Sequence, residues 1–266
     1  MTKPADAPGA PVAIPWLDIQ LTAASAEDVA TWMLRRPSRV ARSYTLGNLN
    51  LHGLYLFYTD RSFHQHVKQA DALLADGWPI WAMMKVIGWR RKIAVDYSHR
   101  VGSTDWLDAL IRKGTDARIK ILAVGGTQDS SRDARDEIQK RNSAIEWTAV
   151  DGYEGAQRLT TGGFGNREFN VVMVGLGMPL QEHWILKNKD MFEHSIIANV
   201  GGCIDYYSGQ QELAPRFLGR LGFEWLYRLA KDPRRLWRRY LVEPFQLAFV
   251  MIKNRGRSPF DATEKR

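Results

Sequence analysis

The chain has 266 residues, of which 45% are hydrophobic and 25% charged, and its formal net charge is +8. This length suits one substantial core or two small lobes, and the composition is typical of a soluble globular protein. A single cysteine, Cys203, excludes an internal disulfide and fits a reducing compartment, and no apolar run approaches the roughly 20 residues of a membrane-spanning helix.

Composition and charge divide the chain into three parts. Residues 1–15 are rich in Ala and Pro and lack an apolar segment, so we expect a loose, disordered leader and not a signal peptide. Residues 16–214 are expected to form an α/β core. Residues 215–266 contain 13 Lys or Arg against 5 Asp or Glu and so carry the whole net charge, whereas residues 1–214 contain 24 of each. We expect this basic, aromatic end to be a helical appendage that associates with a membrane surface.

Apolar, β-rich runs alternate with helical patterns along the chain, which predicts a Rossmann-like, mostly parallel sheet with helices on both faces. The expected strands are 43–46, 72–75, 120–124, 146–150, 170–174 and 195–200. The expected helices are 50–58, 79–87, 104–113, 130–141, 179–188 and 216–229. A final basic helical stretch, 233–253, should be broken or kinked at Pro244.

Several predicted strands end in a carboxylate or in glycine. One strand runs into Asp76, and others run into glycine pairs: Gly125 and Gly126, Gly175 and Gly177, and Gly201 and Gly202, the last with Asp205 close behind. Ligands of open α/β sheets bind beyond the carboxyl ends of the strands. Glycine lets backbone N–H groups approach a phosphate there, and a following helix N-terminus favours its negative charge.

The sharpest local motif is Val174-Gly-Leu-Gly-Met-Pro-Leu-Gln-Glu182, a strand followed by two glycines and a proline suited to a first helical turn. Gln181 and Glu182 would lie in that turn and bind a nucleotide or sugar hydroxyls. The alternative is a tight turn with a Glu favoured by the helix dipole, and spacing alone leaves both open. The motif is not a full dinucleotide fingerprint, because Leu180 stands where glycine is needed.

Polar residues near two other strand ends have similar alternatives. Asp76 could be a general base that takes a proton from an attacking hydroxyl, or an ordinary turn residue. Asn48 and Asn50 could bind sugar hydroxyls, or cap a helix.

Three arginines in the basic end, Arg228, Arg235 and Arg238, lie seven and three residues apart, which places them near one face if the helix continues. The alternative is a solvated basic face. Pro233 predicts a joint between two helices, and the aromatic residues between the arginines argue against pure solvation. Arginine forks suit diphosphate oxygens.

No residue pattern predicts a metal or a cofactor. The chain contains no Asp-x-Asp and no P-loop, and His64 and His66 lie too close in sequence to share a helical face. Cys203 is expected to be buried beside the glycine turn and not to be a nucleophile.

Together, six ordered motifs resemble the WecG/TagA/CpsF family of bacterial glycosyltransferases (glycosyltransferase family 26) over about residues 40–245. They are Ala75-Asp-Gly77, His99-Arg-Val-Gly-Ser-Thr-Asp105, Ile121-Leu-Ala-Val-Gly-Gly126, Val174-Gly-Leu-Gly-Met-Pro-Leu-Gln-Glu182, Val200-Gly-Gly-Cys-Ile-Asp205, and Phe223-Glu-Trp-Leu-Tyr-Arg228 with Pro233-Arg-Arg-Leu-Trp-Arg-Arg-Tyr240.

The resemblance implies an inverting, metal-independent enzyme that transfers a sugar from a UDP-sugar to a polyprenyl-diphosphate-linked sugar. It implies a peripheral location on the anionic cytoplasmic face of the bacterial inner membrane. Asp76 matches the proposed catalytic base, and Arg228, Arg235 and Arg238 match arginines proposed to close over the site and hold diphosphate. The expected substrate contacts are Asn48, Asn50, Arg100, Asp105, Gln181, Glu182 and Asp205, and the expected nucleotide contacts are Gly125, Gly126, Gly175, Gly177 and Gly201.

The chain departs from the family pattern at Asn48, His99, Ile204 and Leu213, where Thr, Glu, Phe and Arg are usual. These changes bear on the sugar and not on the reaction class. The variant Leu49-Asn-Leu-His52 looks most like the GumM-like, xanthan-type exopolysaccharide glucosyltransferases, so we expect glucose in β-1,4 linkage. The alternative is N-acetylmannosaminyl transfer to polyprenyl-diphosphate N-acetylglucosamine.

Two other classes fit part of the sequence. The positive charge and the arginine-aromatic tail would suit a nucleic-acid-binding protein, although we expect no nucleic-acid partner because the α/β body carries ligand-type turns. The glycine turns would suit a nucleotide-cofactor oxidoreductase, against which the incomplete fingerprint argues. A monomer and a homo-oligomer both fit the sequence.

Overall fold

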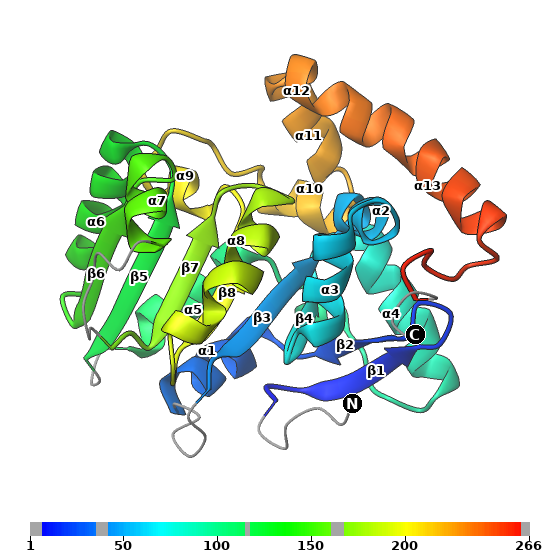
Figure 1. The fold of residues 1–266 in the computed structure, drawn as a ribbon, viewed down its shortest axis with the longest axis horizontal. Coiled ribbons are helices and arrows are strands. Elements are labelled where there is room, and N and C mark those ends of the chain that lie inside the picture. Colours follow the sequence, from blue (N-terminus) through cyan, green and yellow to red (C-terminus); the bar gives the residue numbers. More distant parts are fainter. Residues whose placement is uncertain (1–6, 36–41, 115–117, 161–167, 262–266) are drawn as a thin grey trace.

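The computed structural model describes residues 7–35, 42–114, 118–160 and 168–261. At its centre is a parallel six-stranded sheet with the strand order β4-β3-β8-β7-β5-β6 (Figure 1). The strands are β3 (Tyr44–Leu49), β4 (Ala72–Ala75), β5 (Ile119–Gly125), β6 (Ile145–Val150), β7 (Val171–Gly175) and β8 (Ile196–Asn199). Each predicted strand overlaps an observed one, so the predicted α/β sheet is confirmed.

Helices cover both faces of the sheet, as predicted. One face carries α1 (Ala26–Arg35), α5 (Ser103–Lys113), α6 (Gln128–Arg141) and α9 (Cys203–Tyr207). The other carries α2 (Leu51–Thr59), α3 (Arg61–Gln69), α4 (Trp78–Arg90), α7 (Glu154–Thr160) and α8 (Leu180–Asn188), and short 3₁₀ turns occur at Tyr97–His99 and Lys189–Met191. The pleat of β5 shows why both faces are buried: Ile121 and Ala123 pack on the first face, and Leu122 and Val124 on the second.

Residues 10–14, expected in the disordered leader, form one strand of a hairpin, so that prediction was wrong for them. β1 (Ala10–Ile14) pairs antiparallel with β2 (Ile19–Ala23), and residues 1–6 lie outside the described part. Val12 and Ile14 alternate with more exposed neighbours and are fully buried in the cluster that contains α2–α4. This period-2 pattern is the signal that the compositional interpretation missed.

The basic end forms several short helices, more than the two predicted on either side of Pro233. The predicted helix 216–229 is divided into α10 (Arg216–Leu221) and α11 (Glu224–Lys231) by Gly222, which has φ +80°. α12 (Pro233–Trp237), a π-helical turn (Arg238–Val242) and α13 (Glu243–Lys253) follow. Pro244 lies in the first turn of α13, where its missing N–H costs nothing, so the irregular turn comes before it.

The appendage packs on the core at both ends. α11 and α12 lie over the carboxyl edge of the sheet, and α13 runs beside α2 (Figure 1). Leu247 of α13 is buried in the same cluster as Phe57 of α2. Beyond α13 the chain returns to the core, where Tyr58 Oη donates to the Gly256 carbonyl at 2.7 Å and Lys68 contacts Asp261 at 3.0 Å. Within the described residues, no helix has the length and apolar content to cross a membrane.

The end of β5 gives a stability prediction. Gly125 has φ +153°, and a Cβ there would lie 2.5 Å from the Gly175 carbonyl oxygen, a fixed backbone atom. Gly125→Ala should therefore lower the free energy of unfolding by about 2 kcal/mol or more. Gly209→Ala is the control, since Gly209 has φ +76° but open space around it, and should cost about 1 kcal/mol. Equal losses in denaturant unfolding would contradict the steric cause.

Candidate active site

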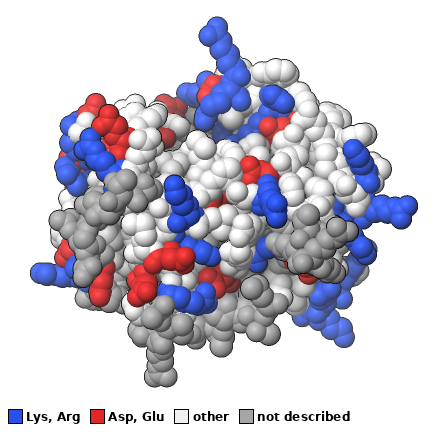
Figure 2. Space-filling view, in the orientation of Figure 1, with Lys and Arg blue, Asp and Glu red and all other residues white. Residues whose placement is uncertain are grey.

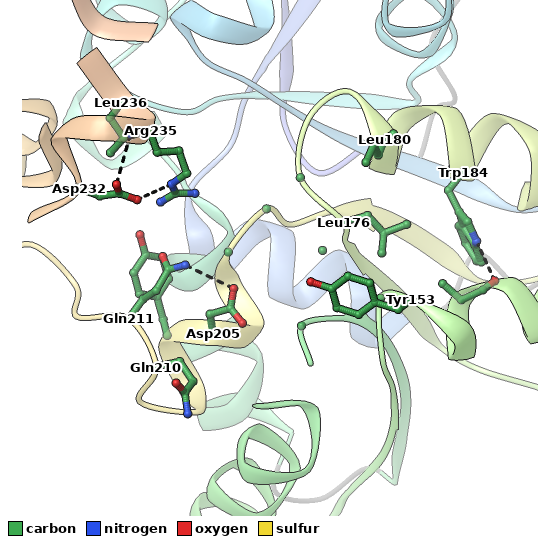
Figure 3. A pocket seen from close by; sticks show the side chains of 18 of the residues that line it. Tyr153, Leu176, Leu180, Trp184, Asp205, Gln210, Gln211, Asp232, Arg235 and Leu236 are labelled. Atoms are coloured by element: carbon green, nitrogen blue, oxygen red, sulfur yellow. Dashed lines mark hydrogen bonds and ion pairs between the residues drawn. The ribbon is translucent and has the colours of Figure 1, made fainter. Parts of the chain in front are cut away.

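The carboxyl edge of the sheet is hollowed by two adjoining cavities. The larger is an open cleft of about 1480 Å³ between the glycine turns of the core and the helices α11 and α12. In Figure 3, Arg235, Asp232 and Leu236 of the appendage lie across this cleft from Tyr153 and Leu176 of the core. The smaller cavity, of about 230 Å³, contains Asp76.

Glycine backbone forms part of the floor of the large cleft. Of the glycines expected to contact a nucleotide, Gly126, Gly175, Gly177 and Gly201 line it, whereas Gly125 does not. Three of these four glycines have positive φ, and a Cβ at Gly177 or Gly201 would meet no atom within 4 Å. Their conformation thus requires glycine while their surroundings stay open, which leaves room for a phosphate against the backbone.

Charged side chains of both signs line this cleft, among them Asp205 and three arginines. Asp205 lies on its floor, where Gln211 Nε2 donates to Oδ2 at 3.4 Å, and burial raises the pKa of the carboxyl (Figure 3). Arg235 lines the opposite wall, with Nε 2.6 Å from Asp232 Oδ2. Arg228 and Arg239 lie where the large cleft meets the small pocket, because both line both cavities. An anion that bridges the cavities would meet these two guanidinium groups.

Asp76 follows β4 at the base of the small pocket. Its backbone N–H donates to the Leu49 carbonyl at 2.9 Å, which continues the pairing of β3 and β4 and fixes the residue after the strand end. Trp78 and Trp225 line the pocket, one from each side of the boundary between core and appendage. The pocket therefore combines a carboxyl group with aromatic walls, a combination that suits a sugar.

Burial raises the pKa of Asp76 to about 6. This value already includes the charges of Glu224 and Asp105, which also raise the pKa, and those of Arg228 and Arg100, which lower it. A carboxyl with a pKa near 6 is largely ionised at neutral pH yet basic enough to accept a proton from a hydroxyl in a transition state. The environment of Asp76 thus fits a general base better than an ordinary turn residue.

The predicted arginine Arg100 belongs to this pocket. Its Nε donates to Tyr97 Oη at 2.9 Å, and Nη1 lies 3.5 Å from Glu224 of α11. Glu224 also pairs with Arg228. One appendage carboxylate therefore connects a core arginine with an appendage arginine.

Two predicted substrate contacts cap helices. Asn50 Oδ1 accepts from the Gly53 N–H at 2.9 Å at the start of α2, and Asp105 Oδ2 accepts from the Gly102 N–H at 2.9 Å at the start of α5. Asn50 also lines the small pocket, so capping fixes its position there. Asp105 lines neither cavity and acts on the site through its effect on the Asp76 pKa.

Asn48, Gln181 and Glu182, all predicted substrate contacts, are buried and line neither cavity. The backbone N–H of Asn48 donates to Asn199 Oδ1 at 2.8 Å, and Asn48 Nδ2 donates to the Asn199 carbonyl at 2.6 Å. Glu182 Oε1 accepts from Asn199 Nδ2 at 2.6 Å and from Gln181 Nε2 at 2.7 Å. Gln181 Oε1 in turn accepts from the Gly201 N–H at 3.0 Å. These side chains hold the floor of the site in place.

Arg238, predicted to bind diphosphate, is exposed and lines neither cavity, whereas the adjacent Arg239 lines both. The spacing of seven and three residues gives one face only if the helix continues, and the predicted joint at Pro233 is present: α11 ends at Lys231 and α12 begins at Pro233. The apolar residue Leu236, which is buried, indicates the side of α12 that faces the core. Because that side recurs after three or four residues, Leu236 predicts position 239 as the next inward one.

Cys203 has the buried position that the sequence predicts. Cys203 is buried, and burial raises the pKa of its thiol. His64 and His66 are both buried in α3. In the described ranges, no three His, Cys, Asp or Glu side chains are grouped so that they could hold a metal ion.

The buried carboxyl of Glu182 gives a pH prediction. Burial raises its pKa from 4.5 to about 7, so in this interval the folded chain keeps a proton that the unfolded chain releases. Wild-type stability should therefore fall as pH rises through this interval, because the folded state binds more protons. Glu182→Gln should lack this fall and be more stable at pH 8 by roughly 3 kcal/mol at most, in urea unfolding. Parallel pH curves for the two proteins would contradict a buried, proton-binding carboxyl.

Comparison with known proteins shows the family of the chain. Residues 14–259 match the model of the glycosyl transferase WecG/TagA/CpsF family. An N-acetylglucosaminyldiphosphoundecaprenol N-acetyl-beta-D-mannosaminyltransferase of Bacillus spizizenii is 28% identical over 191 residues, which cover 71% of this chain and 72% of the relative. One of the same name from Staphylococcus aureus is 24% identical over 200 residues, 74% of this chain and 76% of the relative. The chain belongs to the WecG/TagA/CpsF family of glycosyltransferases.

Proposed function

We propose that this protein transfers a sugar from a UDP-sugar to a polyprenyl-diphosphate-linked sugar. The observation that carries the proposal is Asp76, a carboxyl group with a pKa of about 6 in a pocket that shares Arg228 and Arg239 with a glycine-floored cleft. Two cavities that meet at arginines suit two substrates whose reacting ends meet, each carrying a diphosphate.

The UDP-sugar is proposed to bind in the large cleft. Backbone at Gly177 and Gly201 can approach its diphosphate, because a Cβ at either position would meet no atom within 4 Å. Tyr153 lies exposed at the rim and offers a flat surface to the uracil ring. Asp205 can accept hydrogen bonds from sugar hydroxyls at the floor.

The acceptor sugar is proposed to bind in the small pocket, with Trp78 and Trp225 against its faces. Asp76 takes the proton from the acceptor hydroxyl as its oxygen bonds to the anomeric carbon, and the bond from that carbon to the UDP oxygen breaks. UDP leaves with the bonding electrons, and the anomeric centre is inverted. The arginines stabilise the negative charge that develops on the leaving diphosphate.

The curated relatives favour N-acetylmannosamine over glucose as the transferred sugar. Both are named as N-acetylmannosaminyltransferases that act on N-acetylglucosaminyldiphosphoundecaprenol, and neither supports the exopolysaccharide glucosyl prediction. Asn48, where the family usually has Thr, is buried and lines neither cavity, so this exchange does not act on a sugar there by direct contact. We therefore propose UDP-N-acetylmannosamine as the donor and a polyprenyl-diphosphate N-acetylglucosamine as the acceptor.

The appendage is proposed to hold the protein on the anionic, cytoplasmic face of the bacterial inner membrane. Phe245, Phe249 and Ile252 of α13 are 78%, 66% and 79% exposed. Basic side chains gather along the upper and right edges of Figure 2, over α12 and beside α13. Exposed apolar groups next to basic ones are typical of a helix that lies in a membrane interface.

The transfer assay tests the reaction and its base together. Wild-type protein with a short polyprenyl-diphosphate N-acetylglucosamine should transfer N-acetylmannosamine in preference to glucose, with or without EDTA, as measured by product mass. Its rate should fall below about pH 6, because Asp76 must be ionised to act as the base. Asp76→Asn should lower kcat by about 10²–10⁴-fold while the affinity for UDP and the melting temperature stay unchanged.

Three outcomes would contradict this proposal. Transfer of glucose alone would restore the glucosyl prediction. A variant Asp76→Asn that keeps most of its rate would remove Asp76 from the role of base. No transfer from any UDP-sugar would remove the proposed reaction.

Membrane association can be tested without disturbing the core. Deletion of the appendage would also remove the buried Leu247, so substitutions on the exposed face of α13 are cleaner. Replacing Phe245, Phe249 and Ile252 by Ser should weaken sedimentation with vesicles that contain anionic lipid by about tenfold or more. Met191→Ser, an exposed apolar residue outside the appendage, is the control. Equal vesicle binding by the triple variant and wild type would exclude this face as the anchor.

A further inference from the structure

We infer that Arg239 is the cation that binds the diphosphate where the two cavities meet, in place of Arg238, which the sequence pattern selects. The inference rests on the proposed function and assigns a residue to it.

Position is the first argument. Three residues, Arg228, Arg239 and Tyr240, line both the large cleft and the small pocket. A group at this boundary can reach the donor diphosphate on one side and the acceptor bound near Asp76 on the other. Arg238 lines neither cavity and is exposed on another side of the same turn.

Charge balance is the second argument. Of the three arginines that line the large cleft, Arg228 pairs with Glu224, and Arg235 pairs with Asp232. Glu243, four residues beyond Arg239, is instead bonded to His52 Nδ1 at 2.5 Å. Among the described residues, no carboxylate forms an ion pair with Arg239; its guanidinium lies 6.0 Å from the Tyr240 ring, and its Nε is buried without a hydrogen-bond partner.

Burial makes this lack of a partner costly. Burial is the largest cause that lowers the pKa of Arg239 below its usual value, and the charge of Arg228 acts in the same direction, whereas Tyr240, Glu243 and Asp76 act against it. A buried charge without a partner destabilises a protein. A phosphate or diphosphate that accepts two hydrogen bonds from the guanidinium group would supply that partner. Arg239 therefore carries a positive charge that is unfavourable without a ligand, between two cavities large enough for substrates. This is expected of a residue that binds an anionic ligand.

The local backbone fixes the direction of Arg239. It is the second residue of the π-helical turn Arg238–Val242, a conformation that is rare and often occurs at functional sites. The turn is held on both sides, because Leu236 before it and Leu247 after it are buried. The bond between Glu243 and His52 adds a link from the end of the turn to α2. Arg239 is therefore positioned before any ligand arrives.

The test compares Arg239→Met with Arg238→Met, a matched variant that removes the same charge from the adjacent position. Binding of UDP, and separately of farnesyl diphosphate, is measured by calorimetry on the full-length protein, and thermal unfolding is followed without ligand. Arg239→Met should weaken binding of at least one diphosphate by about tenfold or more, and Arg238→Met should change it less than about twofold. Arg239→Lys should recover part of the loss.

The choice of probe separates the two sources of the diphosphate. Loss of UDP binding alone assigns Arg239 to the donor, loss of farnesyl diphosphate binding alone to the acceptor, and loss of both to the junction. The unliganded melting temperature of Arg239→Met should be equal to or above that of wild type, because an unpaired buried charge has been removed. A structural residue would instead lower it.

Equal affinities in Arg239→Met and Arg238→Met would overturn the inference while the proposed function stands. Wild-type protein that binds neither diphosphate would overturn both. Diphosphate binding by the wild-type protein therefore distinguishes failure of this inference from failure of the proposed function.

Discussion

The site depends on a buried set of hydrogen bonds that joins the two halves of the sheet. Asp76 follows β4, beside β3, whereas the glycine turns follow β5, β7 and β8. Asn48 of β3 bonds to Asn199 of β8, which bonds to Glu182 of α8. Because these amides and the carboxyl are shielded from water, any slip between the halves would leave buried polar groups unpaired, at a cost of about 1–3 kcal/mol each. The distance between the two cavities is fixed in this way.

The appendage closes the site from the other side and brings the charge that the core lacks. Glu224 contacts both Arg100 of the core and Arg228 of the appendage, and all three act on the pKa of Asp76. The carboxyl is therefore tuned by groups that come from two regions of the chain. Burial raises its pKa, and the two arginines oppose that rise; the resulting pKa of about 6 lies in the range where a general base is useful at neutral pH.

The appendage faces the substrate cavities on one side and exposes apolar side chains of α13 on another. α11 and α12 turn arginines toward the clefts, and α13 leaves Phe245, Phe249 and Ile252 exposed beyond its buried Leu247. If α13 lies on a membrane, as proposed, the anchored element and the element that closes the site are one continuous segment. Its return to the core through Gly256 and Asp261 means that this segment is held at both ends.

The sequence alone determined the parallel α/β sheet, the glycine turns at its carboxyl edge, the base candidate Asp76 and the family motifs. These are readable because hydrophobic period, glycine and strand-end carboxylates are local signals. Tertiary structure decided which polar residues face the cavities. Asn48, Gln181 and Glu182 are buried by bonds to residues up to 151 positions away. Arg239, and not Arg238, lines the cleft. The helix breaks at Asp232, so helical periodicity counted across the break does not predict which side chain faces the cleft.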